Sequence, residues 1–511
     1  MSAARRLAAL VGALLLFRVA SAVFVVFQPG YTDAYYYVDV AKRLAAGQGL
    51  TADFVWNFLE YPVTGGDLPI ASHRFWMPLA TALQAVGIKG LAFLDPFHAA
   101  QSAEILVACA IPLVGYLAAR SLGASANTSL VAAALAGLGG AFAPGWVSLD
   151  AFAPAAVIGT AFFLCYRRAA QGDVRYGVAA GLAVGLLFLA RAEAALFGLP
   201  LLLLVRPRAT RRAGLAATAV ALAIGLGWLA RDLALGPGPD LLARSALLVR
   251  YEDFFAVDSS AGIMDLPAVS WDQFTFALPT VLGAKLAALG VNATTFLFAF
   301  GLLLVPGIAR STWALRSRID VRAYAGLAVL VYLVESLVFT LHSTRGSYFH
   351  ALAAFFPFGV ALGVIGTAEL LRTAAGRRLA ATVGVAGAAI VSSFALSQWD
   401  SSFNAPYRER VAIASQIPAG RFMAIDAAAW RWIADRPVVV TPTNLDACAI
   451  GRAADLGVTA LVLERAHFTS YDPLYRGGTP PDFLGAPSTL GDARLYPLDA
   501  RAAERSCRAR L

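Results

Sequence analysis

The sequence predicts a polytopic α-helical membrane protein that ends in a small α/β domain. Two observations predict the membrane part: 59% of the 511 residues are hydrophobic and only 14% are charged, whereas soluble domains contain roughly 45–50% apolar and 25% charged residues. A third observation predicts the C-terminal domain, because short β-like runs alternate with helical runs after about residue 397. The composition therefore excludes a soluble enzyme, and the high apolar content excludes a disordered chain.

Eleven apolar runs approach the length of about 20 residues that a membrane-spanning helix needs. They lie near residues 7–27, 101–119, 128–144, 151–166, 176–190, 193–205, 213–230, 291–309, 323–341, 349–366 and 380–396. The runs 176–190 and 193–205 are short, so we expect a hairpin that need not cross the membrane fully. The segment 78–94 contains Gln84 and Lys89 and is expected to lie at the membrane surface.

The arginines predict the orientation of these spans. With the N-terminus in the cytoplasm, the clusters at 5–6, 167–175, 206–212, 310–322 and 372–378 all lie on the cytoplasmic side, where short loops are enriched in basic residues. An odd number of spans then makes the C-terminal domain extracytoplasmic, with the protein in the inner or plasma membrane. The net charge of +9 is explained by these loops, and no nucleic-acid partner is expected.

The first apolar run also has features of a signal peptide, with residues 20–22 as a cleavage site. Arg18 interrupts its apolar core, which signal peptides rarely tolerate. An ionisable group inside a span usually faces other protein or a polar cavity. We therefore expect an uncleaved first span with Arg18 on its protein-facing side.

Three polar stretches are expected on the outer face. Loops 28–100 and 231–290 belong to the membrane module, residues 1–396, and residues 397–511 form the separate α/β domain. The domain is predicted from strands at 421–425, 437–441 and 458–463 and helices at 427–434 and 444–456, a spacing that favours a parallel sheet. It has no Gly-rich phosphate loop, so its expected role is packing or partner recognition. Cys448 and Cys507 are the only cysteines placed to pair.

Asp33 is the first candidate for chemistry. It follows the first span by about six residues, so its carboxylate is expected at the membrane surface among the rings of Tyr31 and Tyr35 to Tyr37. A carboxylate between an apolar wall and aromatic rings can stay basic enough to accept a proton from a sugar hydroxyl. Alternatively, Asp33 caps a helix over residues 34–46. The two roles are compatible.

The stretches RLAAGQGLTADFVWN, SHRFWMPLATAL and DPFHAAQSAEILVACAIPLVGYLAARSLG, together with Asp33, resemble the GT-C superfamily of integral-membrane glycosyltransferases. The resemblance is strongest to bacterial members of the glycosyltransferase family 39 type, the relatives of protein mannosyltransferases and lipid A aminoarabinose transferase. It covers the layout of most of residues 1–370, with specific motifs at about 28–120, 145–160 and 341–352.

This resemblance implies a GT-C fold and an inverting transfer of a sugar from a polyprenyl-phosphate donor to an acceptor glycan, lipid or protein on the outer face. It implies that Asp33 is the general base. Many relatives have Asp-Glu at this point, whereas this chain has Asp33-Ala34, which leaves metal dependence open.

Asp150 matches the second acidic position of the superfamily. The residues alone also suggest that it caps the fourth span, where the helix dipole favours a negative charge. If Asp33 and Asp150 face one cavity, they either orient the acceptor or share a divalent metal ion through their oxygens. No His/Cys cluster with zinc spacing occurs, so no metal ligand is assigned.

Donor binding requires a cation near the membrane surface, because the leaving group is a lipid phosphate, and the arginine fork suits a phosphate. The candidates are Arg345, which is preferred, and Arg191, Arg231 and Arg18. For Arg191, an internal ion pair with Glu193 is an equal alternative.

Aromatic and histidine side chains near the same sites are candidates for holding the sugar or acceptor. They are Tyr36, Trp56, His73, Trp76 and His350, with Tyr61 as a further aromatic. Aromatic residues at this depth are also ordinary membrane anchors. The main alternative function is a transporter or flippase for a lipid-linked or small solute, but we find no inverted repeat of the kind such proteins contain.

Overall fold

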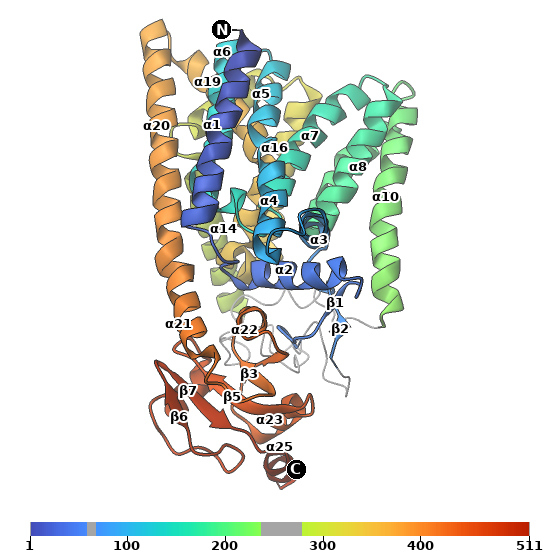
Figure 1. Cartoon of the computed structure of the whole chain (residues 1–511). Helices are drawn as coiled ribbons and strands as arrows, with labels where there is room; N and C mark the ends of the chain where they lie inside the picture. The colour runs from blue at the N-terminus through green and yellow to red at the C-terminus, as the bar shows by residue number, and fades with distance from the viewer. Residues whose placement is uncertain (1, 59–67, 237–277, 510–511) are drawn as a thin grey trace. The chain divides into compact units, whose positions relative to one another are not determined.

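The computed structural model describes residues 2–58, 68–236 and 278–509. The chain forms two compact units (Figure 1). We call the first, Met1–Pro29, Trp76–Gly236 and Ala284–Asp400, the helical unit. The second, Gly30–Phe75, Pro237–Gly283 and Ser401–Leu511, is the α/β unit. The sequence-based division assigned residues 30–58, 68–75 and 278–283 to the membrane module, but they belong to the same compact unit as the C-terminal residues.

The helical unit makes the chain a multi-pass membrane protein. Six helical segments of the described residues are long and apolar enough to cross a bilayer: Ala3–Phe24, Pro96–Ser121, Arg211–Ala234, Leu278–Phe300, Thr340–Leu370 and Ala374–Ala414. Other predicted runs coincide with α6 (Ala126–Leu138), α7 (Phe152–Ala169), α8 (Val174–Ala190) and α16 (Ile319–Leu337). Segment 78–94 contains the helix α3 (Leu79–Gly90). The segments that meet the length criterion are therefore fewer than the eleven predicted.

The prediction of one span over residues 291–309 is wrong. The helix α14 (Leu278–Phe300) ends at Gly301, whose φ of +74° lies in the left-handed region. A new helix, α15 (Val305–Ala314), begins with Pro306 in its first turn. Glycine adopts a positive φ without steric cost and proline has no amide to donate within a helix. Together these residues separate the two helices.

Small residues allow helices of this unit to approach closely. Gly177 and Gly181 of α8 face Ala213 and Ala217 of α10 (Arg211–Ala234), and these two helices run side by side in Figure 1. Similarly, α15 packs on α19 (Phe356–Leu370) through glycines that leave no room for a Cβ. Membrane helices associate through this kind of contact, because burial from lipid gives little hydrophobic gain.

Replacing one of these glycines tests the packing. A Cβ at Gly366 of α19 would overlap the backbone oxygen of Gly307, so Gly366→Ala is expected to lower the free energy of unfolding by about 1–3 kcal/mol. Gly384 of α20 (Ala374–Trp399) has open space around its Cβ position, and Gly384→Ala is the matched control with an unchanged or slightly higher melting temperature. Equal melting temperatures of the two variants in detergent would contradict this packing.

The C-terminal residues form a five-stranded sheet in the order β4-β3-β5-β7-β6. The predicted strands are present as β3 (Arg421–Ala424), β4 (Val438–Val440) and β5 (Val458–Leu463), and β3 pairs in parallel with both others. The predicted helices are α22 (Ala427–Ala434) and α23 (Ala447–Ala454). Two antiparallel strands, β6 (Ser488–Leu490) and β7 (Ala493–Pro497), extend the sheet. The predicted parallel arrangement is confirmed, and the antiparallel edge is additional.

A disulfide bond joins Cys448 of α23 to Cys507 of α25 (Ala500–Arg508). It is the pair that the sequence singled out. The bond links residues 59 positions apart, and closing a loop of this length stabilises a folded domain by about 4 kcal/mol in the chain-entropy account. It therefore fixes the end of the chain to the sheet.

The first loop is part of the α/β unit. It contains the helix α2 (Thr32–Ala45) and the short strands β1 (Thr51–Ala52) and β2 (Ile70–Ala71), which pair antiparallel. Val55 adds to the edge of β4: its amide donates to the Val438 oxygen at 3.0 Å, and the Val440 amide donates to the Val55 oxygen at 2.7 Å. Two segments almost 400 residues apart therefore share one sheet edge.

Asp39 lies buried where α2 packs on α22. Its side chain is 1% exposed, and the Nε of the Arg431 guanidinium is 4.0 Å from Asp39 Oδ2. Burial raises the pKa of Asp39 to about 6, and the attraction of Arg431 only partly opposes this rise. The folded chain therefore favours the protonated acid relative to the unfolded chain.

The sign of the resulting pH dependence follows directly. A raised pKa in the folded state gives stability that is present below pH 4 and is lost as the pH rises through about 6. The loss amounts to about 3 kcal/mol by pH 7. Asp39→Asn is expected to remove this part of the pH dependence when melting temperatures are compared between pH 4 and 8. Parallel curves for the variant and the parent chain would refute it.

Candidate functional site

Asp150 and His350 lie together in the helical unit. Asp150 lies two residues before the first residue of α7 (Phe152–Ala169), is 1% exposed, and its Oδ1 accepts a hydrogen bond from the Ala151 amide at 2.5 Å. His350 belongs to α18 (Tyr348–Leu352), and its Nδ1 is 3.5 Å from Asp150 Oδ2. The ring of Phe152 packs against the imidazole with 4.1 Å between centroids. A carboxylate and an imidazole thus converge at the N-terminal end of α7.

The capping alternatives for the two aspartates are wrong. The N-cap of α7 is Ala151, and the N-cap of α2 is Tyr31, neither with a side-chain cap. The helix α2 begins at Thr32 rather than at residue 34, so Asp33 lies inside its first turn, where the helix dipole still favours a carboxylate. Asp33 is half-buried and belongs to the α/β unit.

Arg191 is the centre of a polar cluster in the helical unit. The helix α8 ends at Ala190, and the backbone of Arg191 is extended, so Arg191 is no longer part of the helix. Its Nε forms the ion pair with Glu193 that the sequence offered as an alternative role. A second guanidinium nitrogen donates to Ser347 Oγ at 3.1 Å, and this hydroxyl donates to Glu335 Oε1 at 3.4 Å. The guanidinium is thereby held between two carboxylates, one direct and one through Ser347.

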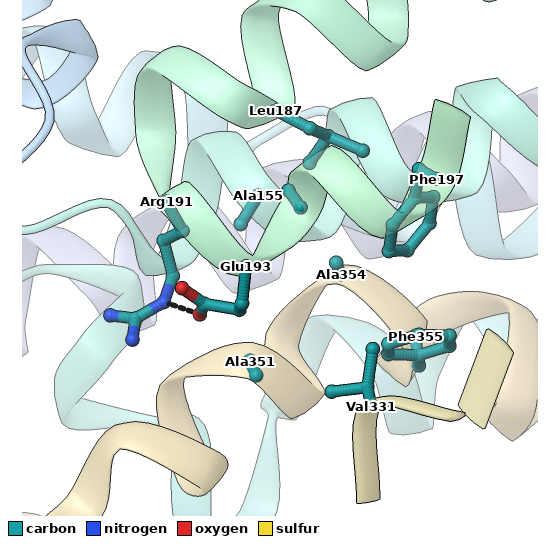
Figure 2. Close-up of a pocket in the computed structure, with 10 residues that line it drawn as sticks. Ala155, Leu187, Arg191, Glu193, Phe197, Val331, Ala351, Ala354 and Phe355 are labelled. Atoms are coloured by element: carbon teal, nitrogen blue, oxygen red, sulfur yellow. Dashed lines mark hydrogen bonds and ion pairs between the residues drawn. The ribbon is translucent and has the colours of Figure 1, made fainter. Parts of the chain in front are cut away.

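Arg191 and Glu193 lie at the edge of an apolar pocket (Figure 2). Its other lining residues are Ala155, Leu187, Ala194, Phe197, Val331, Ala351, Ala354 and Phe355. They come from α7, α8, η3 (Ala192–Phe197), α16, α18 and η5 (Ala353–Phe355). Figure 2 shows the ion pair at one end and the rings of Phe197 and Phe355 at the other. The pocket is therefore apolar apart from this ion pair.

No family model and no curated protein matches the sequence. Solved structures do match. One is ArnT from Cupriavidus metallidurans in the apo state, with 15% identity, a TM-score of 0.56 and coverage of 98% of this chain and 99% of that chain. ArnT bound to undecaprenyl phosphate matches with 13% identity, a TM-score of 0.56 and coverage of 97% and 98%.

A third match is the archaeal oligosaccharyltransferase AglB from Archaeoglobus fulgidus, in complex with an inhibitory peptide and a dolichol-phosphate. Its identity is 13%, its TM-score is 0.52, and 89% of this chain and 69% of that chain are covered. Both proteins have the GT-C fold that the sequence resemblance implied. This chain has the GT-C fold.

The other three predicted phosphate ligands lie elsewhere in the GT-C fold, and Arg191 is the only one of the four that lines the described pocket. Arg18 is buried in α1 (Ala3–Phe24) and donates to the Gly137 oxygen at 2.9 Å, so it ties α1 to α6. Arg231 stacks on Trp228 of its own helix, 4.6 Å from the ring centroid. Arg345, the preferred candidate, is exposed and next to Gly346, which has a φ of +120°.

Three of the predicted substrate-binding residues meet in the α/β unit. The ring of Tyr36 lies 6.1 Å from that of Trp56 and 5.2 Å from that of His73. The Tyr36 hydroxyl accepts from the His73 amide at 2.5 Å, and both residues are 1% exposed. Tyr36 and His73 therefore form part of the loop's core, whereas Trp56 is half-buried. Trp76 is half-buried in the helical unit, and Tyr61 and residues 237–277 of the second loop lie outside the described residues.

Sequence reasoning missed two buried carboxylates in membrane helices. Glu335 of α16 is 1% exposed and belongs to the Arg191 cluster. Glu104 of α4 (Pro96–Ala108) is fully buried and accepts from Gln84 Nε2 at 3.2 Å. Both lie inside runs that had been recognised as apolar. An acidic residue in such a run is itself a signal of a protein-facing or functional position, and it would have identified both.

The Arg191 cluster makes a prediction about stability. Arg191→Met leaves Glu193 and Glu335 without their cation, and breaking a partly buried ion pair from one side is destabilising because it leaves an uncompensated charge. We expect a marked fall in melting temperature for this variant and a smaller fall for the double variant Arg191→Met/Glu193→Gln, in which no unpaired charge is left at position 193. Purified proteins in one detergent give the comparison. If the double variant is the less stable of the two, the ion pair does not have this role.

Proposed function

We propose that this chain is an inverting glycosyltransferase that moves a hexose or pentose from a polyprenyl-phosphate donor to an acceptor hydroxyl on the outer face of the membrane. The observation that carries the proposal is the apolar pocket with Arg191 at its edge. It occurs in a chain with the fold of ArnT, whose structure has been solved with undecaprenyl phosphate. The pocket has the two features that a lipid phosphate requires: apolar walls and a permanent cation.

The lipid phosphate is the leaving group in this proposal, so its charge grows during the reaction. A guanidinium fixed beforehand by Glu193 and Ser347 can receive this charge without reorganising. Arg345 is exposed two residues before Ser347 and is proposed as a second phosphate ligand. Arg18 and Arg231 have packing contacts within the helical unit and are not given a role in donor binding.

The chemical step is a direct displacement. The acceptor oxygen forms a bond to the anomeric carbon while the bond from that carbon to the phosphate oxygen breaks, and the phosphate leaves with the electron pair. Asp33 takes the proton of the acceptor hydroxyl. Attack opposite to the leaving group inverts the anomeric carbon, and no covalent enzyme intermediate is required. Trp56 and Trp76 are half-buried and remain candidates for contact with the sugar.

Asp150 and His350 are proposed either to orient the acceptor or to hold a divalent metal ion. Their donor atoms, a carboxylate oxygen and an imidazole nitrogen 3.5 Å apart, suit a transition-metal dication. Such an ion would contribute positive charge near the reacting phosphate. The displacement itself needs only the proton transfer to Asp33.

The orientation proposed from the arginines has the N-terminus in the cytoplasm and the α/β unit outside. The disulfide between Cys448 and Cys507 supports this placement, because disulfides form and persist in oxidising compartments and are rare in the cytosol. The proposed location is the inner or plasma membrane, where a polyprenyl-phosphate donor and an outer-face acceptor meet.

Turnover of the purified protein tests the function. It would be incubated with a panel of radiolabelled undecaprenyl-phosphate hexoses and pentoses, and release of undecaprenyl phosphate would be measured. Asp33→Asn is expected to lower turnover by about 10²–10⁴-fold, the usual contribution of a general base, while binding of undecaprenyl phosphate stays within twofold of the parent chain.

Asp95→Asn is the matched control. Asp95 is a carboxylate that caps α4, and asparagine caps helices equally well, so this variant should keep the parent turnover. Full turnover by Asp33→Asn would rule out the proposed base. Movement of an intact labelled donor across vesicle membranes without release of undecaprenyl phosphate would instead identify a flippase.

A further inference from the structure

The sheet of the α/β unit has a switch point at which α/β folds usually bind ligands. From β3 the chain continues through α22 to β4, which lies on one side of β3, whereas from β5 it continues to β6 and β7, which lie on the other side of β5. In open α/β sheets the crevice outside the carboxyl ends of two such strands is the common ligand site. Asp426 follows β3 after one residue, and Glu464 follows β5 directly.

An arginine side chain of the same chain binds both of these carboxylates. Arg410 of α21 (Ala405–Ala414) places its Nε 2.6 Å from Glu464 Oε1, and another nitrogen of its guanidinium 3.2 Å from Asp426 Oδ2. The Trp430 indole nitrogen donates to the second Glu464 oxygen at 2.9 Å. The side chains of these ionic residues are at most 17% exposed. The Arg410 guanidinium is therefore held between two carboxylates at the carboxyl ends of β3 and β5.

The helix that carries Asp33 is attached to this ionic group. Thr32, the first residue of α2, donates from its hydroxyl to Asp426 Oδ1 at 3.3 Å. The same oxygen accepts from the Ala429 amide and so caps α22. Tyr31 packs its ring 5.6 Å from that of Phe403, which lies close to α21. Asp426 thus joins Arg410, the start of α22 and the start of α2 at one carboxylate.

A second attachment holds the remainder of α2 and its loop. Arg431 of α22 binds Asp53 with its Nε at 2.6 Å and faces Asp39 at 4.0 Å. The Lys42 ammonium lies 4.8 Å from the centroid of the Trp432 ring. Contacts at residues 32, 39 and 42 lie at helical spacing along one side of α2. A helix held at three points along one side cannot roll about its axis without breaking charged contacts.

We propose that Arg410 is a positioning residue that, through Asp426 and Thr32, fixes the first turn of α2 and so the carboxylate of Asp33. Asp33 is the residue directly after Thr32, and a shift of this turn moves the base by the same amount. A misplacement of about 1 Å in a reacting group can cost a factor of about 10² in rate. The C-terminal α/β domain therefore serves as the support of the first loop. The catalytic role of Asp33 rests on the proposed function. The fixing of its position by Arg410 does not depend on that function.

Thiol labelling measures the position of Asp33 without any substrate. Asp33→Cys would be reacted with a water-soluble maleimide in the otherwise unchanged chain and in an Arg410→Met background, with the signal of Cys109 and Cys165 subtracted by using the parent chain. Loss of the Arg410 contacts is expected to release the first turn of α2 and to raise the labelling rate severalfold. In chains that retain Asp33, Arg410→Met is expected to lower turnover about 10–100-fold with binding of undecaprenyl phosphate unchanged.

Arg436→Met is the matched control. Arg436 is another arginine of the α/β unit, and it donates to the backbone oxygens of Ala414, Ile417 and Pro418 rather than to the Asp426 group. Its loss should lower the melting temperature without changing the labelling of Asp33→Cys. Arg410→Lys keeps the positive charge but not the planar set of guanidinium donors. Its labelling rate and its turnover should therefore lie between those of Arg410→Met and the parent chain.

The outcomes separate the two proposals. An unchanged labelling rate in folded Arg410→Met protein overturns the positioning role. Faster labelling together with full turnover of Asp33→Asn leaves the positioning role standing and removes Asp33 as the base. If Arg410→Met does not fold, Asp426→Asn replaces it: the amide oxygen still caps α22, but the charge that binds Arg410 is lost. An unchanged labelling rate in that variant overturns the proposal equally.

Discussion

A guanidinium taken out of water keeps its charge, so the protein around it has to supply the acceptors that water would have supplied. This constraint organises both units. In the helical unit it fixes Arg191 between Glu193 and the Ser347 hydroxyl at the edge of an apolar pocket. In the α/β unit it fixes Arg410 between Asp426 and Glu464 at the end of the sheet. Each cluster joins segments far apart in the sequence, and each adjoins a residue with a proposed part in the chemistry.

Local features of the structure could be predicted from the sequence. Short apolar runs predicted the strands β3, β4 and β5. The helical spacing of apolar residues between the first two runs predicted the helix α22. The helix α8 follows from a continuous apolar run that ends at Arg191. The break at Gly301 could not be predicted from hydropathy, because the residues on both sides of it are equally apolar. The backbone conformation of Gly301, and not a change in polarity, ends α14.

Candidate site residues could be picked from the sequence only where the residue type itself is unusual at its position, as a charged residue is beside an apolar run. Asp33 and Arg191 became candidates because a charge beside an apolar run is costly and therefore informative, whereas Asp150 became one through the family resemblance. The burial of Tyr36 and His73 was not predictable. Aromatic residues occur near a membrane surface whether they anchor the protein in the membrane, bind a substrate or pack in the core, so the sequence does not distinguish these roles. The contact of Thr32 with Asp426 joins residues 394 positions apart and leaves no local pattern. Such contacts follow from the fold and not from spacing in the sequence.

A structure of the full chain with undecaprenyl phosphate in a lipid nanodisc tests donor binding most directly. We expect the phosphate to contact the Arg191 guanidinium and the first isoprenes to lie along Leu187, Phe197 and Phe355 of the apolar pocket. A phosphate bound away from Arg191, with this pocket empty of lipid, would show that the fixed guanidinium at the edge of the apolar pocket does not receive the leaving group.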